Sequence, residues 1–167
     1  MSSDTFTTAM FLITAVLAAG VLINAVFPVV YQMAGTFQSA THASDVRLRT
    51  DVTIITTFSS GSPSLSGQVW LKNIGSQPIA KAELNSSDVF FGPVGSFHRL
   101  DMPADLGNGY WTYSLSDING NGYWDPGETL EIDAYPPAGG PAPSGTLVYF
   151  QFVLPTGVSR SVQFTVS

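Results

Sequence analysis

Cysteine is absent from this sequence, and charged residues make up only 11% of its 167 positions. The absence of thiols excludes disulfide bonds and thiolate metal sites, so cysteine usage says nothing about the redox compartment. Only 6 residues are Lys or Arg, against 12 Asp and Glu, and the formal net charge is −6. Because nucleic-acid binding requires clustered basic side chains, this balance argues against nucleic acid as a partner.

Catalytic signatures are also missing. The chain contains 2 histidines, His42 and His98, which are far apart in the sequence. No spacing of Ser, His and Asp, and no pair of neighbouring carboxylates, indicates a catalytic centre. We therefore expect a protein without enzymatic activity.

A third absence concerns the N-terminal part, where Thr5 to Thr41 contains no Asp, Glu, Lys, Arg or His. Within this run, residues 6–27 are long enough to cross a bilayer core of about 30 Å as a helix. A core helix of a soluble protein rarely lacks a charged face over such a length, and a cleavable signal normally begins with basic residues. We therefore expect residues 1–45 to form a retained transmembrane or assembly helix with a stalk.

Four positions bear on the start and the packing of this helix. Asp4 suits the positive end of the helix dipole. Ala15 and Ala19 lie about one turn apart, a spacing that lets helix backbones approach closely in lipid, although frequent Ala also produces it by chance. Pro28 lacks a backbone donor and is expected to kink or interrupt the helix near Asn24. These features predict a homo-oligomer or filament that assembles through the N-terminal helix.

The period of the sequence changes to two at Arg47, and the alternation up to Phe58 predicts a long, half-buried strand. Seven or eight short strand-like segments separated by turns are typical of an antiparallel, immunoglobulin-like β-sandwich. We therefore predict a mainly β fold, with a long N-terminal α-helix followed by a sandwich over residues 46–167. Residues 136–145, rich in Pro and Gly, are expected to form a loop. The expected strands are 47–58, 68–72, 79–84, 88–91, 110–115, 129–135, 146–154 and 158–166.

The sharpest local motif runs from Asp117 to Glu128. It matches a twelve-residue calcium loop, with Gly122 at the sharp turn and Glu128 at the bidentate position. Three carboxylates and two neutral amides suit a structural calcium ion of modest affinity outside the cell. The alternative is a turn rich in Asn, Asp and Gly that needs no metal. The expected ligands are Asp117, Asn119, Asn121, the backbone carbonyl of Tyr123, Asp125 and Glu128.

Asn85, Ser86 and Ser87 form an acceptor sequon for N-glycosylation. A chain with this much Ser and Thr is also expected to contain one such sequon by chance. Glycosylation of Asn85 is therefore a prediction that fits a domain outside the cell.

Two parts of the chain carry a family resemblance. The opening Met1–Phe6, which runs into the apolar helix, and the segments Arg47–Val52 and Val69–Ser76 resemble the archaellar accessory protein G family (FlaG, also ArlG) of methanogenic archaea. The resemblance implies a stator component of the archaellum motor, held in the cytoplasmic membrane with its sandwich in the pseudoperiplasm. It also implies assembly through the helix and binding to accessory protein F, which in turn contacts the S-layer.

Two alternatives remain open. A filament-forming archaellin or type IV pilin-like subunit has the same parts, but it is usually made with a basic leader and has a Glu early in the mature helix. Here only Asp4 comes near that Glu, and no leader precedes Met1. A membrane-anchored, calcium-dependent adhesin would bind a sugar or a protein through an exposed loop such as residues 90–97.

Overall fold

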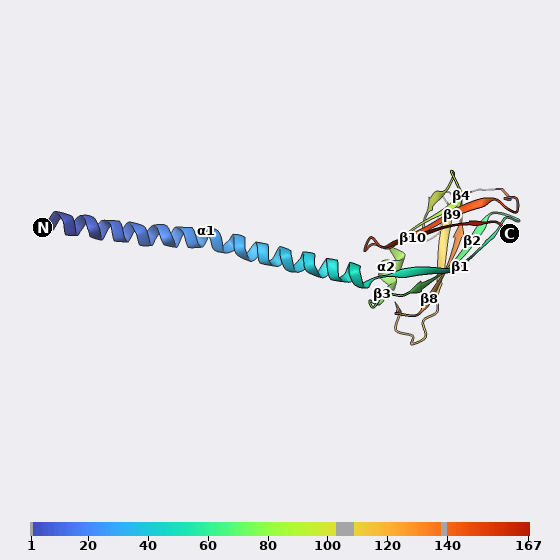
Figure 1. The fold of residues 1–167 in the computed structure, drawn as a ribbon, viewed down its shortest axis with the longest axis horizontal. Helices are drawn as coiled ribbons and strands as arrows, with labels where there is room; N and C mark the ends of the chain where they lie inside the picture. The colour runs from blue at the N-terminus through green and yellow to red at the C-terminus, as the bar shows by residue number, and fades with distance from the viewer. Residues whose placement is uncertain (1, 103–108, 138–139) are drawn as a thin grey trace. The chain divides into compact units, whose positions relative to one another are not determined.

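A computed structural model describes residues 2–102, 109–137 and 140–167 of the chain (Figure 1). The structure consists of two compact units, Met1–Ser44 and Asp45–Ser167. Two residues of the Pro- and Gly-rich loop expected at 136–145, namely 138 and 139, lie outside the described residues.

Helix α1 runs without a break from Ser2 to Arg49, with Pro28 inside it. Of the kink or interruption expected near Asn24, the interruption is therefore wrong. A proline removes only its own backbone donor, and the hydrogen bonds of the neighbouring turns still hold the helix. The side chains from Ser3 to Ser44 are all exposed, so no described part of the chain covers this apolar surface.

The predicted strand from Arg47 also begins too early, because α1 continues to Arg49. Thr50 donates both its amide and its hydroxyl to the carbonyl oxygen of Val46, at 2.9 and 2.8 Å. These bonds satisfy a carbonyl of the last helical turn. The first strand, β1, starts only at Val52.

The described residues of the second unit form ten strands and one short helix, α2. They are β1 (Val52–Ser60), β2 (Ser66–Asn73), β3 (Ile79–Ala80), α2 (Lys81–Asn85), β4 (Asp88–Pro93), β5 (His98–Leu100), β6 (Tyr110–Leu115), β7 (Tyr123–Trp124), β8 (Thr129–Tyr135), β9 (Leu147–Val153) and β10 (Ser159–Thr165).

Eight of these strands build two antiparallel sheets. The first sheet has the order β1-β2-β8-β6 and the second has the order β10-β9-β4-β5, while β3 and β7 form a separate pair. Figure 1 shows the two sheets packed on each other. The prediction of a mainly β fold, with a long N-terminal helix followed by antiparallel sheets, is confirmed.

Alternate residues of the strands fill the core between the sheets. On β8, the side chains of Leu130, Ile132 and Ala134 are fully buried, as the alternating pattern of a half-buried strand requires. Trp111 and Trp124 are also buried, and each meets the ring of Phe152 edge to face. The rings of the two tryptophans lie 6.4 and 6.5 Å from the Phe152 ring. Edge-to-face packing suits the charge distribution of aromatic rings.

One predicted strand is largely wrong and two strands were not predicted. In the segment 79–84, only Ile79 and Ala80 are extended, and Lys81–Asn85 forms α2. Good helix formers such as Ala82, Glu83 and Leu84 suit this turn, and Leu84 is buried in the core. Strands β5 and β7 have only 3 and 2 residues, too few for a periodic pattern.

The two ends of the sandwich are formed by different segments of the chain. At one end the chain arrives from α1, and Arg160 at the start of β10 forms an ion pair with Asp51. We call the opposite end, formed by Leu65 and residues 93–98 and 140–147, the distal end. There the amide of Val94 donates to the carbonyl of Leu147 at 3.0 Å.

Candidate functional site

Helix α1 is the one helix in the described part of the chain that is long and apolar enough to cross a membrane. Its most apolar 18-residue window has a mean hydropathy of 2.4. The four predicted assembly positions, Asp4, Ala15, Ala19 and Pro28, are all exposed on this helix. Among the described residues no second helix packs against them, so their role remains a prediction.

The predicted calcium loop folds around the carboxylate of Asp117. Its oxygens accept hydrogen bonds from the amides of Gly120, Asn121 and Gly122, at 2.7, 3.2 and 2.8 Å. Gly120 and Gly122 have positive φ angles of 69° and 81°, a conformation that glycine adopts without a steric penalty. The hydrogen bond from Gly122 is the largest of the effects that lower the pKa of Asp117, because it stabilises the carboxylate.

The remaining side chains of the loop are joined by further hydrogen bonds. The side-chain amides of Asn119 and Asn121 both donate to Oδ2 of Asp125, at 2.6 and 2.7 Å. Glu128 is buried, and its two carboxylate oxygens accept from the amides of Ile118 and Asp125, at 2.9 and 3.0 Å. The loop motif therefore produces a closed network of hydrogen bonds.

A calcium ion would require a rearrangement of this network. No three Asp, Glu, His or Cys side chains among the described residues are grouped so that they would hold a metal. Asn119 and Asn121 present amide nitrogen to Asp125, and each would have to turn its oxygen toward the ion. Tyr123, whose backbone carbonyl was one of the six predicted ligands, lies in β7 opposite Ala80. The oxygen donors themselves are of the type that calcium prefers.

Asn73 fastens this loop to the sandwich. Its buried side-chain amide donates to the carbonyl oxygen of Trp124 at 2.9 Å, and its own carbonyl accepts from Gly127 at 2.7 Å. The turn that follows Asn73 reaches the end of α1, where the amide of Ser76 donates to the carbonyl of Arg49 at 2.9 Å. Residues 117–128 are thus connected through a single turn to the last residue of the helix.

The predicted glycosylation site lies at the end of α2. Asn85 is exposed, and its Oδ1 accepts a hydrogen bond from the hydroxyl of Tyr113 at 2.9 Å. Burial raises the pKa of Tyr113, so the hydroxyl keeps its proton. This bond uses the amide oxygen of Asn85 and not the nitrogen to which a glycan is attached.

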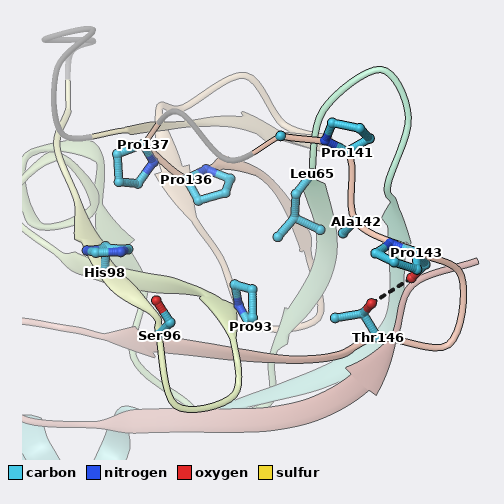
Figure 2. Close-up of a pocket in the computed structure, with 11 residues that line it drawn as sticks. Leu65, Pro93, Ser96, His98, Pro136, Pro137, Pro141, Ala142, Pro143 and Thr146 are labelled. Atoms are coloured by element: carbon cyan, nitrogen blue, oxygen red, sulfur yellow. Dashed lines mark hydrogen bonds between the residues drawn. The ribbon is translucent and has the colours of Figure 1, made fainter.

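The distal end carries a groove of about 440 Å³ that the sequence did not predict (Figure 2). Figure 2 shows Leu65 inside the groove, between Pro136 on one side and Ala142 on the other. No Asp, Glu, Lys or Arg is found among the described residues that line it. Five of these residues are prolines, Pro93, Pro136, Pro137, Pro141 and Pro143.

Three exposed apolar side chains, two in the turn between β4 and β5 and one at the start of β9, neighbour residues of the groove in the sequence. The side chains of Val94, Phe97 and Leu147 are 48, 46 and 44% exposed. The ring of Phe97 packs against that of Tyr149, with centroids 4.7 Å apart, which fixes the turn on the second sheet. We call Val94, Phe97 and Leu147 the distal patch.

The structure shortens the exposed loop that was expected over residues 90–97. Strand β4 extends to Pro93, and the ring of Phe91 is fully buried between the sheets. Only the turn from Val94 to Phe97 is free to act as a surface. The sequence signal for the groove was the run of prolines between Pro136 and Pro143, but this signal does not show which strands the prolines face.

Comparison with known proteins places these features in context. The archaeal-type flagellin family matches residues 3–164. A solved structure of the archaellum periplasmic stator protein FlaG from Sulfolobus acidocaldarius is 25% identical, with a TM-score of 0.55, and the match covers 69% of this chain and 99% of that chain.

Two further solved structures share the fold. The periplasmic stator protein complex of FlaF and FlaG from the same organism is 24% identical, with a TM-score of 0.52, over 68% of this chain and 87% of that chain. The archaeal flagellum of Methanospirillum hungatei strain JF1 is 20% identical, with a TM-score of 0.59, over 92% of this chain and 91% of that chain.

Proposed function

Because the chain belongs to the archaeal-type flagellin family, we propose that it is a structural component of the archaellum that acts in the stator of the motor. The match to the stator protein FlaG carries this proposal, since it covers 99% of that chain. The similar proteins are structural parts of the archaellum and not enzymes. The chain accordingly belongs to a class that works through binding and mechanical resistance.

The parts of the chain suit such a role. A rotating filament needs a stationary element that is fixed to the envelope, and an apolar helix with a well-packed sandwich provides one without a catalytic site. Helix α1 exposes its apolar side chains along its length, which is compatible with a membrane anchor. At about 1.5 Å per residue, the uncharged run Thr5–Thr41 would be roughly 55 Å long, more than a bilayer core of about 30 Å requires. In this proposal the excess length is a stalk that carries the sandwich outside the cytoplasmic membrane.

The proposal includes two kinds of partner. A similar solved structure is the complex of FlaF and FlaG, and by analogy accessory protein F would bind the sandwich and link it to the S-layer. Copies of the chain would associate through α1, with Asp4, Ala15 and Ala19 close to the contact. Both partners follow from the proposed place of the protein between membrane and envelope.

A shearing experiment tests the stator role. Surface filaments are stripped from cells, and the chain is quantified in the filament and membrane fractions. A stator component is expected in the membrane fraction, with only traces in the filaments. Recovery as a main component of the filaments would contradict the proposal.

A filament subunit is the second candidate, because the match to the archaeal flagellum spans 92% of this chain, including most of α1. In that case α1 would pack with copies of itself in the filament core. The same fractionation separates the two candidates, since each places the protein in a different fraction.

We also propose that residues 117–128 bind calcium as a structural ion. The support is the full loop motif with its oxygen donors, together with the connection of the loop to the core through Asn73. A chelator should then lower the melting temperature of the full chain in detergent, and added calcium should restore it. The Asp117→Asn variant should lose this response, whereas Asp133→Asn, on β8, should keep it. An unchanged melt in the wild-type chain would exclude the ion.

Glycosylation of Asn85 is proposed on the sequon and the exposure of the side chain. Protein isolated from its native host should contain a glycan on the peptide with Asn85, and Asn85→Gln should abolish it. An unmodified peptide at this position would exclude the site.

A further inference from the structure

The glycosylation sequon contains two side chains that differ in exposure. Asn85, which would carry the glycan, is exposed, whereas Ser87, the hydroxyl residue of the sequon, is only 6% exposed. We propose that folding closes Asn85 to glycosylation, so that the glycan is attached before the segment around α2 folds. The inference rests on the proposed modification of Asn85 and adds the stage at which it takes place.

The chemistry of the transfer explains why both side chains matter. The side-chain nitrogen of Asn85 attacks the anomeric carbon of a lipid-linked oligosaccharide, the bond from that carbon to the lipid phosphate breaks, and the nitrogen releases one proton. A side-chain amide is a weak nucleophile, so this step requires an enzyme that holds the acceptor. Because an acceptor sequon has Ser or Thr at its third position, that enzyme recognises the hydroxyl together with the asparagine. The acceptor must therefore present Ser87 as well as Asn85.

The hydroxyl of Ser87 is occupied within the fold. It donates to the carbonyl oxygen of Glu83 at 2.8 Å, and the amide of Ser87 donates to the carbonyl of Leu84 at 3.1 Å. These bonds turn the sequon back onto α2. In an extended segment, residues two positions apart face the same side, and an enzyme could contact both. Here the turn leaves Asn85 in solvent and buries Ser87.

The chain on either side of the sequon is fixed in the core. Leu84, directly before Asn85, and Val89, the second residue of β4, are both fully buried. Asp88, the first residue of β4, pairs with Val153 of β9. Only four residues lie between the two buried side chains. The sequon therefore cannot extend away from the surface unless α2 or the start of β4 opens.

The finished glycan, in contrast, is compatible with the folded chain. The hydroxyl of Tyr113 donates to the amide oxygen of Asn85 at 2.9 Å, and this bond does not involve the nitrogen that would carry the glycan. Because the Asn85 side chain is exposed, a glycan on it would extend into solvent. The fold thus accommodates the product, while the burial of Ser87 opposes the reaction that forms it.

Transfer of the glycan to the folded chain should proceed only through local opening. Its rate is then the rate for an open acceptor multiplied by the fraction of chains in which the sequon is open. The test uses the full chain, produced without glycosylation and folded in detergent, and a synthetic peptide of residues 79–93 as the open acceptor.

Both acceptors are incubated with archaeal membranes that contain an oligosaccharyltransferase and its lipid-linked oligosaccharide. Mass spectrometry then follows the modified fraction of Asn85 over time. The peptide is expected to be modified at least about tenfold faster than the folded chain.

Two variants of the full chain test the part played by the local fold. Ala82→Gly weakens α2 at an exposed position and should raise the transfer rate by about threefold. Tyr113→Phe is the matched control, because it frees the side chain of Asn85 and leaves the bonds of Ser87 in place. This variant should be modified as slowly as the wild-type chain. Thermal melts check that the sandwich of each variant remains folded.

The outcomes separate the inference from the proposed glycosylation. A folded chain that is modified as fast as the peptide would overturn the inference and leave Asn85 as an acceptor. If the peptide stays unmodified while another sequon peptide is modified, Asn85 is no acceptor, and the proposed glycosylation fails together with the inference. An increase in Tyr113→Phe as large as in Ala82→Gly, or no increase in Ala82→Gly, would overturn the role given to Ser87 and α2.

Discussion

At the scale of single residues, Asn73 joins several segments of the sandwich, although no sequence motif pointed to it. Its side-chain amide donates to the carbonyls of Trp124 and Gln77, and its oxygen accepts from Gly75, all within 3.0 Å. The residue is fully buried and so is its bond to Trp124, so the loss of that bond leaves the carbonyl of Trp124 without water to replace it. Asn73 therefore stabilises residues 117–128 and the turn at the end of α1 together.

We predict that Asn73→Ala lowers the free energy of unfolding by about 3 kcal/mol. Denaturant unfolding followed by tryptophan fluorescence reports on the sandwich, because Trp111 and Trp124 are in its core. Asn119→Ala, at an exposed position of the loop, is the control and should lose less than about 1 kcal/mol when both variants are measured in chelator. Equal losses in the two variants would contradict the role given to Asn73.

We predict that the carboxyl of Asp117 makes the stability of the folded chain depend on pH. The pKa of its carboxyl is lowered, first by the hydrogen bond from Gly122, so the folded state favours the ionised form. Its contribution to stability is present above the ordinary pKa near 3.8 and is lost as the pH falls through the lowered pKa. Melting temperatures measured in chelator between neutral pH and this range should fall more for the wild-type chain than for Asp117→Asn. Parallel curves would show that the loop does not depend on this carboxylate.

At the scale of elements, the close packing of the two sheets depends on a glycine at a point of contact between them. Gly67 on β2 faces the ring of Phe91 on β4, and a Cβ at this position would lie 2.6 Å from the ring. Such a distance cannot be accommodated unless the ring moves, and the ring is fully buried. The glycine thus sets the separation of the sheets at this point.

Gly67→Ala should accordingly destabilise the sandwich by about 1–3 kcal/mol. Gly140→Ala serves as the control, since a Cβ at this position would have no atom within 4 Å among the described residues other than its chain neighbours. That substitution should change the free energy of unfolding by less than about 0.5 kcal/mol. Both values are obtained from the same denaturant titrations, and a neutral Gly67→Ala would mean that the sheets separate more easily than their packing indicates.

At the scale of the whole molecule, the two compact units are expected to have separate roles. Residues 2–44 carry the exposed apolar surface, while the core residues belong to Asp45–Ser167. Deletion of residues 2–44 should therefore release the chain from the membrane fraction of cells. Fractionation followed by immunodetection measures this, with the full chain as the control. A truncated chain that stays with the membrane would show that the sandwich has a membrane contact of its own.

The sequence by itself determined the features that depend on neighbours along the chain. The uncharged run from Thr5 to Thr41 predicted an apolar helix, because hydropathy and helix length are local properties. Alternation over 110–115 and 129–135 predicted β6 and β8 with correct bounds, since the period of a strand is set residue by residue. The loop motif at 117–128 was recognised for the same reason, and its calcium remains a prediction.

Only the tertiary structure decided the features that join distant segments. The carbonyl of Arg49, the last residue of α1, accepts a hydrogen bond from the amide of Ser76, far along the chain. The distal groove forms because prolines near residue 140 meet Leu65, which directly precedes β2, and Pro93 at the end of β4. Burial and hydrogen bonding across such separations depend on the packed arrangement of the whole sandwich, and a single sequence does not state which residues will meet.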